Sequence, residues 1–215
     1  LTTCFNMEIF MKQLTRIAPI LLLVLGACAD VEDGADGHDG HHHHDHEVIT
    51  TVVLNFTPAE GDVVSATWSD ISGEVEIDDI TLTDATEYSL SFEILNELET
   101  PTEDVTPEIA DEDDEHQVFI TGDAVDGPAT ADNANAIVEH AYADEDVNGL
   151  PIGLTNDITT IATGSGDFIV TLRHMPLQNG NTIKTEGAAE DVASDGFGAI
   201  GGDSDFQLTF ELTVE

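Results

Sequence analysis

The chain has 215 residues, with 4 lysines and arginines against 45 aspartates and glutamates, and a formal net charge of −41. A chain this acidic cannot bind nucleic acid by neutralising phosphates, so we exclude nucleic acid as a partner. The carboxylates have two explanations: hydration of the surface in a salty medium, typical of halophilic proteins, or binding of divalent cations. Their spread along the whole sequence favours salt as the main cause.

Residues 1–27 predict a bacterial signal peptide, which begins at Met11 or Met7 and follows an upstream extension over residues 1–10. Two basic residues precede an apolar run, 17–27, that is about 11 residues long and too short to span a bilayer comfortably. Small residues then stand where cleavage requires them. We therefore expect export from the cytoplasm.

Cys28 ends the run LGAC, which reads as a lipobox. Cleavage before Cys28 would leave it as a lipid-modified N-terminus, so we expect an anchored lipoprotein of the cell envelope, at the outer membrane. Cys28 is then the only cysteine of the mature chain, and we expect neither a disulfide nor thiol catalysis.

Residues 28–47 predict a lipidated, disordered tether rich in histidine and aspartate. Six histidines fall within nine residues, among acidic neighbours. Neutral imidazole is a common ligand for zinc, copper and nickel, and carboxylates complete mixed sites. We expect this tract to bind a divalent transition metal, zinc by commonness; the alternatives are a polar spacer or an expression tag. The expected ligands are His38, His41, His42, His43, His44, His46 and Glu47.

Residues 48–215 predict one all-β domain, a single antiparallel, Ig-like β-sandwich. Short runs rich in β-branched and aromatic residues alternate with Gly, Asp and Asn turns. The clearest run, 87–95, alternates apolar and polar residues and has one face for a core. The predicted strands are 48–56, 63–68, 87–95, 117–121, 135–143, 157–162, 167–174 and 205–214.

One short helical insert is expected over residues 106–115. Thr106 can cap its N-terminus, Pro107 fits the first helical position, and Glu108 suits the positive end of the helix. Residues 185–203 are rich in Gly, Ala and Asp, and we expect a long loop there.

The run DEDVNG at 144–149 has the D-x-D-x-N-G start of a calcium loop. The closing position holds Thr155 in place of a bidentate glutamate, although Asp157 lies close. The alternative is an acidic turn between two strands. The candidate calcium ligands are Asp144, Asp146, Asn148 and Asp157.

Three histidines fall within the predicted domain: His116, His140 and His174. Each alone is more often a packed or surface residue than a ligand. His116 and His174 are the pair that we favour as metal ligands, because both stand at the ends of β-rich runs. Arg173, one of two fixed cations after residue 27, is expected to pair with a carboxylate.

No G-x-S-x-G, H-E-x-x-H or P-loop motif occurs in the chain, and its serine, lysine and cysteine residues do not form the pattern of an activated nucleophile. We therefore do not expect an enzyme.

Four stretches carry a resemblance: HHHHDHEVITTVVLNF at 41–56, FEILNELETPTEDVTPEIADEDDEHQVF at 92–119, DEDVNGLPIGLTND at 144–157 and TLRHMP at 171–176. Together they resemble small, uncharacterised bacterial envelope lipoproteins that are often labelled type 1 periplasmic binding fold superfamily proteins. The resemblance covers most of 46–215. It implies a place beside TonB-dependent outer-membrane receptors, and places His116 and His174 in family-typical segments. The label implies a two-lobed α/β fold, whereas the strand pattern favours a sandwich.

Two functions follow as expectations. The first is an anchored lipoprotein that binds a divalent transition metal, zinc above others, for capture or for delivery to an outer-membrane transporter. The second is a cell-surface adhesion or structural module stabilised by calcium.

Overall fold

The computed structural model describes residues 47–215. The predicted signal peptide, the predicted lipidation site at Cys28 and the six tether histidines lie outside the described residues. Glu47, the last residue of the predicted tether, lies within them. No helix of the described part is long and apolar enough to cross a membrane.

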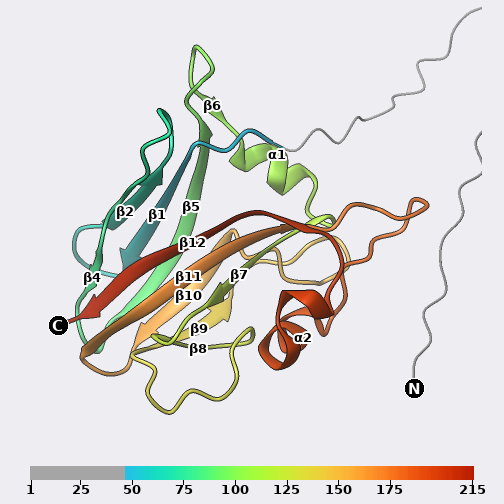
Figure 1. Ribbon diagram of the computed structural model, residues 1–215. Helices are drawn as coiled ribbons and strands as arrows, with labels where there is room; N and C mark the ends of the chain where they lie inside the picture. The colour runs from blue at the N-terminus through green and yellow to red at the C-terminus, as the bar shows by residue number, and fades with distance from the viewer. Residues whose placement is uncertain (1–46) are drawn as a thin grey trace, which may run out of the picture. The chain divides into compact units, whose positions relative to one another are not determined.

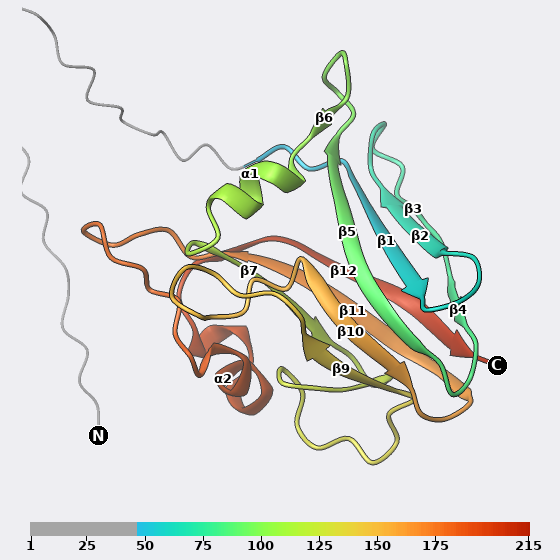
Figure 2. The same ribbon diagram turned by 180° about the vertical axis from the view of Figure 1, so that it is seen from behind.

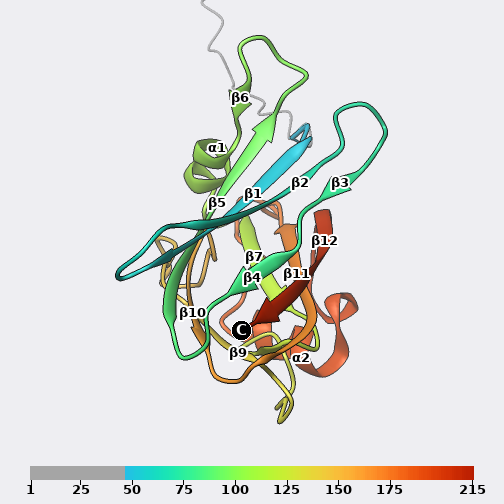
Figure 3. The same cartoon turned by 90° about the vertical axis from the view of Figure 1, so that its left-hand side faces the viewer.

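The described domain is all-β and consists of two sheets that pack as a sandwich (Figure 1, Figure 3). The larger, eight-stranded sheet has the order β3 (Glu76–Ile77), β2 (Val64–Ser69), β1 (Thr51–Pro58), β5 (Glu87–Asn96), β10 (Thr155–Thr160), β9 (Val138–Tyr142) and β8 (Val125–Asp126), with β6 (Glu103–Asp104) paired to β5. The smaller sheet has the order β4 (Ile80–Leu82), β12 (Asp203–Val214), β11 (Gly164–His174) and β7 (His116–Thr121). The prediction of an all-β sandwich is confirmed.

The core lies between the two sheets and follows the alternation of the sequence. Along β5, every second side chain from Tyr88 to Asn96 is buried, and β12 repeats the pattern from Phe206 to Val214. Phe56 of the larger sheet meets Phe168 of the smaller one edge to face, with ring centroids 5.9 Å apart. Burial of this apolar surface is the main favourable contribution to folding.

Two strand pairs are parallel within the sandwich, which is otherwise antiparallel as predicted. β12 pairs with β4, and β8 pairs with β9, in parallel register. Alternation shows which face of a strand is buried but does not show the direction of its neighbour. Parallel neighbours need a long connection, and β4 and β12 are separated by most of the domain.

The predicted helical insert is present as α1 (Thr106–Asp111) and is shorter than the expected 106–115. Pro107 stands in its first turn, but the N-cap is Val105, and Thr106 does not cap the helix. The Thr106 hydroxyl instead accepts a hydrogen bond from the Ile94 N–H at 2.8 Å. This contact joins α1 to β5.

The expected loop at 185–203 was wrong in part, because it contains α2 (Ala188–Asp195) and a 3-10 turn, η1 (Phe197–Ala199). α2 buries Ala188, Ala189 and Val192 in a small cluster with Phe119 of β7. Figure 3 shows α2 on the side of the smaller sheet that faces away from the larger one. Packing against Phe119 stabilises a helix that local composition alone does not indicate.

Candidate metal centre

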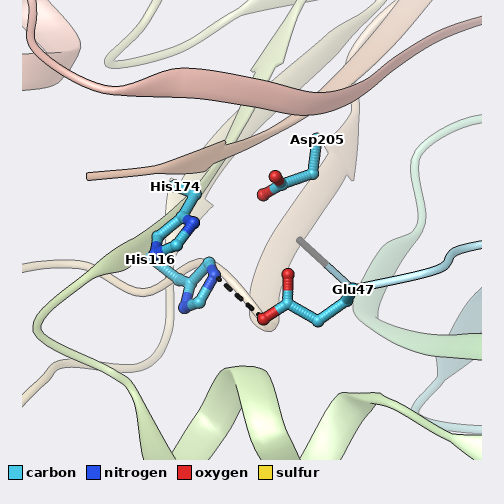
Figure 4. A group of neighbouring side chains, drawn as sticks. All are labelled: Glu47, His116, His174 and Asp205. Atoms are coloured by element: carbon cyan, nitrogen blue, oxygen red, sulfur yellow. Dashed lines mark ion pairs between the residues drawn. The ribbon is translucent and has the colours of Figure 1, made fainter. Parts of the chain in front are cut away.

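Four side chains that can ligate a metal converge at one end of the sandwich (Figure 4). They are Glu47, His116, His174 and Asp205, and one ligand atom from each lies within 4.8 Å of the others. Both histidines are buried, with His116 fully inaccessible and His174 4% exposed, whereas Glu47 and Asp205 are half-buried. Two imidazoles and two carboxylates form a donor set that can hold a metal ion.

The two histidines are neighbours because β7 and β11 pair antiparallel. His116, the first residue of β7, is in register with His174, the last residue of β11. Their rings stack with centroids 4.6 Å apart and an angle of 16° between planes. By alternation they share the inner face with the core residues Val118 and Leu172. The inner face of the smaller sheet therefore ends in two imidazole side chains, where the rest of the face carries apolar side chains.

Asp205 joins the histidines because of an irregularity in β12. Leu172 pairs with Phe206 and Arg173 pairs with Ser204, so Asp205 is an extra residue without a register partner. Strict alternation from the buried Phe206 would turn Asp205 to the outer face. A β-bulge re-aims the side chain beside it, and here it directs Asp205 to the inner face.

Glu47 reaches the cluster from the segment that leads into β1 of the larger sheet. Its Oε1 lies 3.9 Å from His116 Nε2, and its side chain is 7% exposed. Figure 1 and Figure 2 both show α1 beside the segment that leads into β1. Burial raises the pKa of Glu108 on this helix, and the negative charge of Glu47 raises it further, so Glu47 lies near α1. The four residues thus connect both sheets.

One nitrogen of each ring lies near an oxygen outside the cluster. His116 Nδ1 lies 3.2 Å from the Glu112 carbonyl, which can only accept, so Nδ1 carries the proton and Nε2 does not. His174 Nε2 lies 3.8 Å from Glu115 Oε2, and Glu115 is itself held by the Leu177 N–H at 2.9 Å. Metal-ligating histidines commonly have such a carbonyl or carboxylate behind them.

Two buried acceptor atoms of Glu47 and His116 could both be satisfied by a bound cation. His116 Nε2 and Glu47 Oε2 are buried, and neither has a hydrogen-bond partner among the described residues. With Nδ1 protonated, both atoms are acceptors in a region from which water is excluded, which costs free energy. A metal ion would coordinate the lone pairs of both atoms and so remove this cost.

Burial, and next the proximity of His174, lower the pKa of His116, while the charges of Glu47 and Asp205 oppose the shift. His116 is therefore neutral at neutral pH, as a metal ligand must be. As metal ligands, two neutral imidazoles and two carboxylates would together carry a charge of −2, which a divalent ion balances.

The structure brings His116 and His174 together, as the pair that the sequence favoured. Glu47 was expected to act with the tether histidines, which lie outside the described residues, and its side chain lies in this folded cluster. Sequence reasoning missed Asp205, because in a chain with 45 acidic residues a single aspartate carries no signal.

Within the described part of the chain, the candidate calcium carboxylates Asp144, Asp146 and Asp157 do not form a three-carboxylate group that could hold a metal ion. Both oxygens of Asp144 accept backbone hydrogen bonds, from Gly153 at 2.6 Å and Thr155 at 2.8 Å. Asp146 accepts from two backbone N–H groups and has Lys184 Nζ 3.1 Å from its Oδ2. The carboxylates hold an irregular turn, and the Lys184 ammonium group pairs with Asp146.

His140 is a structural residue of β9. Its Nε2 lies 2.9 Å from Asn156 Oδ1, and its ring packs edge to face against Tyr142 at 4.9 Å between centroids. It lies outside the metal-ligand cluster.

Arg173 was expected to pair with a carboxylate, and the contacts in the described part are different. Its guanidinium donates to the carbonyls of Gly201 and Gly202 and to the Ser204 hydroxyl, and lies 5.9 Å from the Phe197 ring centroid. Arg173 therefore holds the turn before β12, next to the bulge that positions Asp205.

Comparisons of the chain with protein-family models, with curated proteins and with solved structures found no match. The function of the cluster must therefore be argued from its own chemistry.

Proposed function

We propose that this protein binds one divalent transition-metal ion, zinc above others, through Glu47, His116, His174 and Asp205. The observation that carries the proposal is the convergence of two buried imidazoles and two carboxylates within 4.8 Å. Nitrogen and oxygen donors without thiolate suit zinc and its neighbours in the first transition row, while magnesium and calcium prefer oxygen alone. The charge of −2 on the four ligands supports a divalent ion.

The number of protein ligands, four, favours a site that holds the ion over a site that uses it for catalysis. Zinc in proteins is four-coordinate in structural sites, whereas catalytic sites keep one position open for water or substrate. With the lipid anchor expected at Cys28, this supports metal capture in the cell envelope. The predicted neighbourhood of TonB-dependent receptors supports delivery to an outer-membrane transporter as the next step.

The test is equilibrium binding of zinc to the full chain in high salt, compared among three variants. The first replaces the six tether histidines with asparagine, so that only the folded cluster can supply imidazole. The second replaces His116 and His174 with asparagine and keeps the tether. The third combines both sets. We expect the first variant to retain one tightly bound ion and the third to retain none.

Loss of tight binding in the first variant would overturn the proposal, since the zinc would then belong to the tether alone. Calcium is the control ion for the same three variants. It prefers six to eight oxygen ligands, and we expect it to bind no variant in a way that depends on His116 or His174.

A further inference from the structure

A cavity lies on the outer face of the smaller sheet, apart from the metal-ligand cluster. Its volume is about 520 Å³, within the range of roughly 300–1,000 Å³ that is usual for small-molecule sites. One wall is the C-terminal half of α2 with the turn into η1, and the other is the segment from the end of β7 to residue 133. His116 begins β7 and faces the core, whereas Thr121 ends β7 and lines the cavity. By alternation the two sites therefore lie at opposite ends and on opposite faces of one strand.

The wall formed by α2 and η1 gives the cavity an apolar surface. Val192 of α2 and Ala129 of the facing segment are 6% and 3% exposed, and the half-buried Phe197 lines the cavity with them. Phe197 meets Phe119 of β7 edge to face, with ring centroids 5.4 Å apart, so the sheet holds this wall in place. An apolar group gains free energy when it leaves water for such a surface.

The facing wall is held by its own hydrogen bonds. Asn133 Nδ2 donates to the carbonyls of Asp123 at 2.8 Å and Val125 at 3.2 Å. The Thr130 hydroxyl donates to the Gly127 carbonyl at 2.9 Å and accepts from the Gly127 N–H at 2.7 Å. A ligand that enters the cavity therefore does not have to order this segment, which reduces the free-energy cost of binding.

The rim of the cavity is acidic. Asp123 and Asp132 are exposed and line it, and Asp123 Oδ1 accepts from the Asp167 N–H at 2.6 Å, which fixes that carboxylate. The described residues that line the cavity include no lysine, arginine or histidine. They also include no group of three metal-ligating side chains. Two carboxylates beside an apolar wall suit an organic cation better than a bare metal ion.

We propose that this cavity binds a small organic cation, with its ammonium group at Asp123 and Asp132 and an apolar, ring-sized body against Val192 and Phe197. The site is separate from the metal cluster, and the inference does not rest on the proposed function. Exposed carboxylates contribute modest free energy in salt. Selection therefore comes from charge and apolar contact together, and an anion of the same shape is repelled.

The experiment measures binding of three indole compounds to the full chain. Tryptamine carries an ammonium group, tryptophol a neutral hydroxyl and indoleacetate a carboxylate, on the same ring. Ligand-observed NMR at an ionic strength of about 0.15 M, where charges beyond about 8 Å are largely screened, gives the dissociation constants.

Two variants test the cavity, each with a matched control. Ala193→Trp fills it, because Ala193 lines the wall formed by α2, and Ala199→Trp is the control at an exposed position of η1 outside the lining. Asp132→Asn removes one rim carboxylate, and Asp62→Asn is the control at an exposed position in the turn after β1. Each variant has the same net charge as its control, so general attraction to an acidic chain cancels.

We expect tryptamine to bind about 3- to 10-fold more tightly than tryptophol, and indoleacetate to bind least. Ala193→Trp should lose most tryptamine binding while Ala199→Trp retains it. Asp132→Asn should weaken tryptamine about 2- to 5-fold relative to Asp62→Asn and leave tryptophol unchanged.

Equal tryptamine binding in Ala193→Trp and Ala199→Trp would overturn the proposal, since the amine would then be held by the surface charge in general. Undetectable tryptamine binding to the original chain, or indoleacetate binding as tight as that of tryptamine, would overturn it as well. If Ala193→Trp does not fold, the Asp132→Asn comparison decides, and equal tryptamine affinities in Asp132→Asn and Asp62→Asn would contradict the site. None of these results changes the proposed metal binding.

Discussion

At the scale of single residues, the groups behind the two histidines decide how firmly an ion can be held. Glu115 is buried, with 6% exposure, and its Oε2 both accepts from the Leu177 N–H and lies 3.8 Å from His174 Nε2. A carboxylate at this ion-pair distance behind a histidine ring helps to orient the ring as a ligand. Glu115 is therefore a positioning residue.

We expect Glu115→Gln to weaken zinc binding at the cluster by about 10- to 100-fold, the usual cost of losing such a partner. The number of ions bound at saturation should not change. Competition with a chromogenic chelator measures the affinity, and Glu211→Gln, an exposed change on β12, is the matched control. Equal affinities in the two variants would contradict the positioning role.

A second prediction concerns His140, which is separate from the cluster. Burial lowers its pKa from the ordinary 6.5, against the opposing hydrogen bond to Asn156. Below that ordinary value the unfolded chain takes up a proton that the folded His140 resists, so the free energy of unfolding falls as the pH falls. In His140→Gln this component is absent.

Urea unfolding of the metal-free protein between about pH 7.5 and 5.5 measures the effect. We expect the original chain to lose its stability advantage over His140→Gln as the pH falls. Parallel stability profiles for the two chains would show that His140 does not contribute.

The cluster also shows how far residue-scale prediction extends. His116 and His174 could be paired from sequence, because only three histidines fall within the predicted domain and these two stand at the ends of β-rich runs. Asp205 could not, since its inward orientation depends on the bulge between Leu172 and Arg173 in the register of two strands. A bulge is a property of strand pairing and has no reliable signature in one strand.

At the scale of elements, an ion pair joins the irregular segments beside the sandwich. Lys184 Nζ lies 3.1 Å from Asp146 Oδ2, with both side chains fully inaccessible, and also donates to the Asp113 carbonyl at 2.9 Å. Burial lowers the pKa of Lys184, and the pairing with Asp146 opposes that shift. Three segments distant in sequence meet at one ammonium group.

Removing only the lysine should be costly. We expect Lys184→Met to destabilise the domain by about 3–5 kcal/mol, because it leaves a buried carboxylate without its cation. Lys184→Met combined with Asp146→Asn should be less destabilised, since the amide oxygen still accepts from the Asn148 and Leu150 N–H groups. Denaturant unfolding of both single variants and the double variant gives the coupling energy. Simple additivity would contradict a direct interaction.

The elements that sequence predicted well are those with clear alternation, such as β5 and β12. The parallel partner of β12 and the helix α2 were missed for a different reason. Each depends on a contact distant in sequence, with β4 in one case and Phe119 in the other. Local propensity does not contain that contact.

At the scale of the whole molecule, an ion in the cluster would bind the two sheets to each other. Glu47 belongs to the segment that enters the larger sheet, and the other three ligands belong to the smaller one. A ligand that binds only the folded state raises stability by about 2.7 kcal/mol at 100 times its dissociation constant.

We therefore expect zinc at that concentration to raise the melting temperature of the asparagine variant of the tether by about 5–10 °C, for a domain of this size. Calorimetry with zinc and then with excess chelator should show the rise and its reversal. His116→Asn with His174→Asn in the same background is the control. A rise of equal size in that control would show that zinc acts elsewhere.

The position of β12 in space has a consequence for how the protein folds. This strand is central in the smaller sheet, between β4 and β11, although most of the domain separates it in sequence from β4. Until β12 pairs, β4 and β11 lack their shared neighbour and Asp205 has not joined the histidines. Pairings between such distant segments form slowly. Completion of the smaller sheet and assembly of the ion's ligands thus depend on the same folding step.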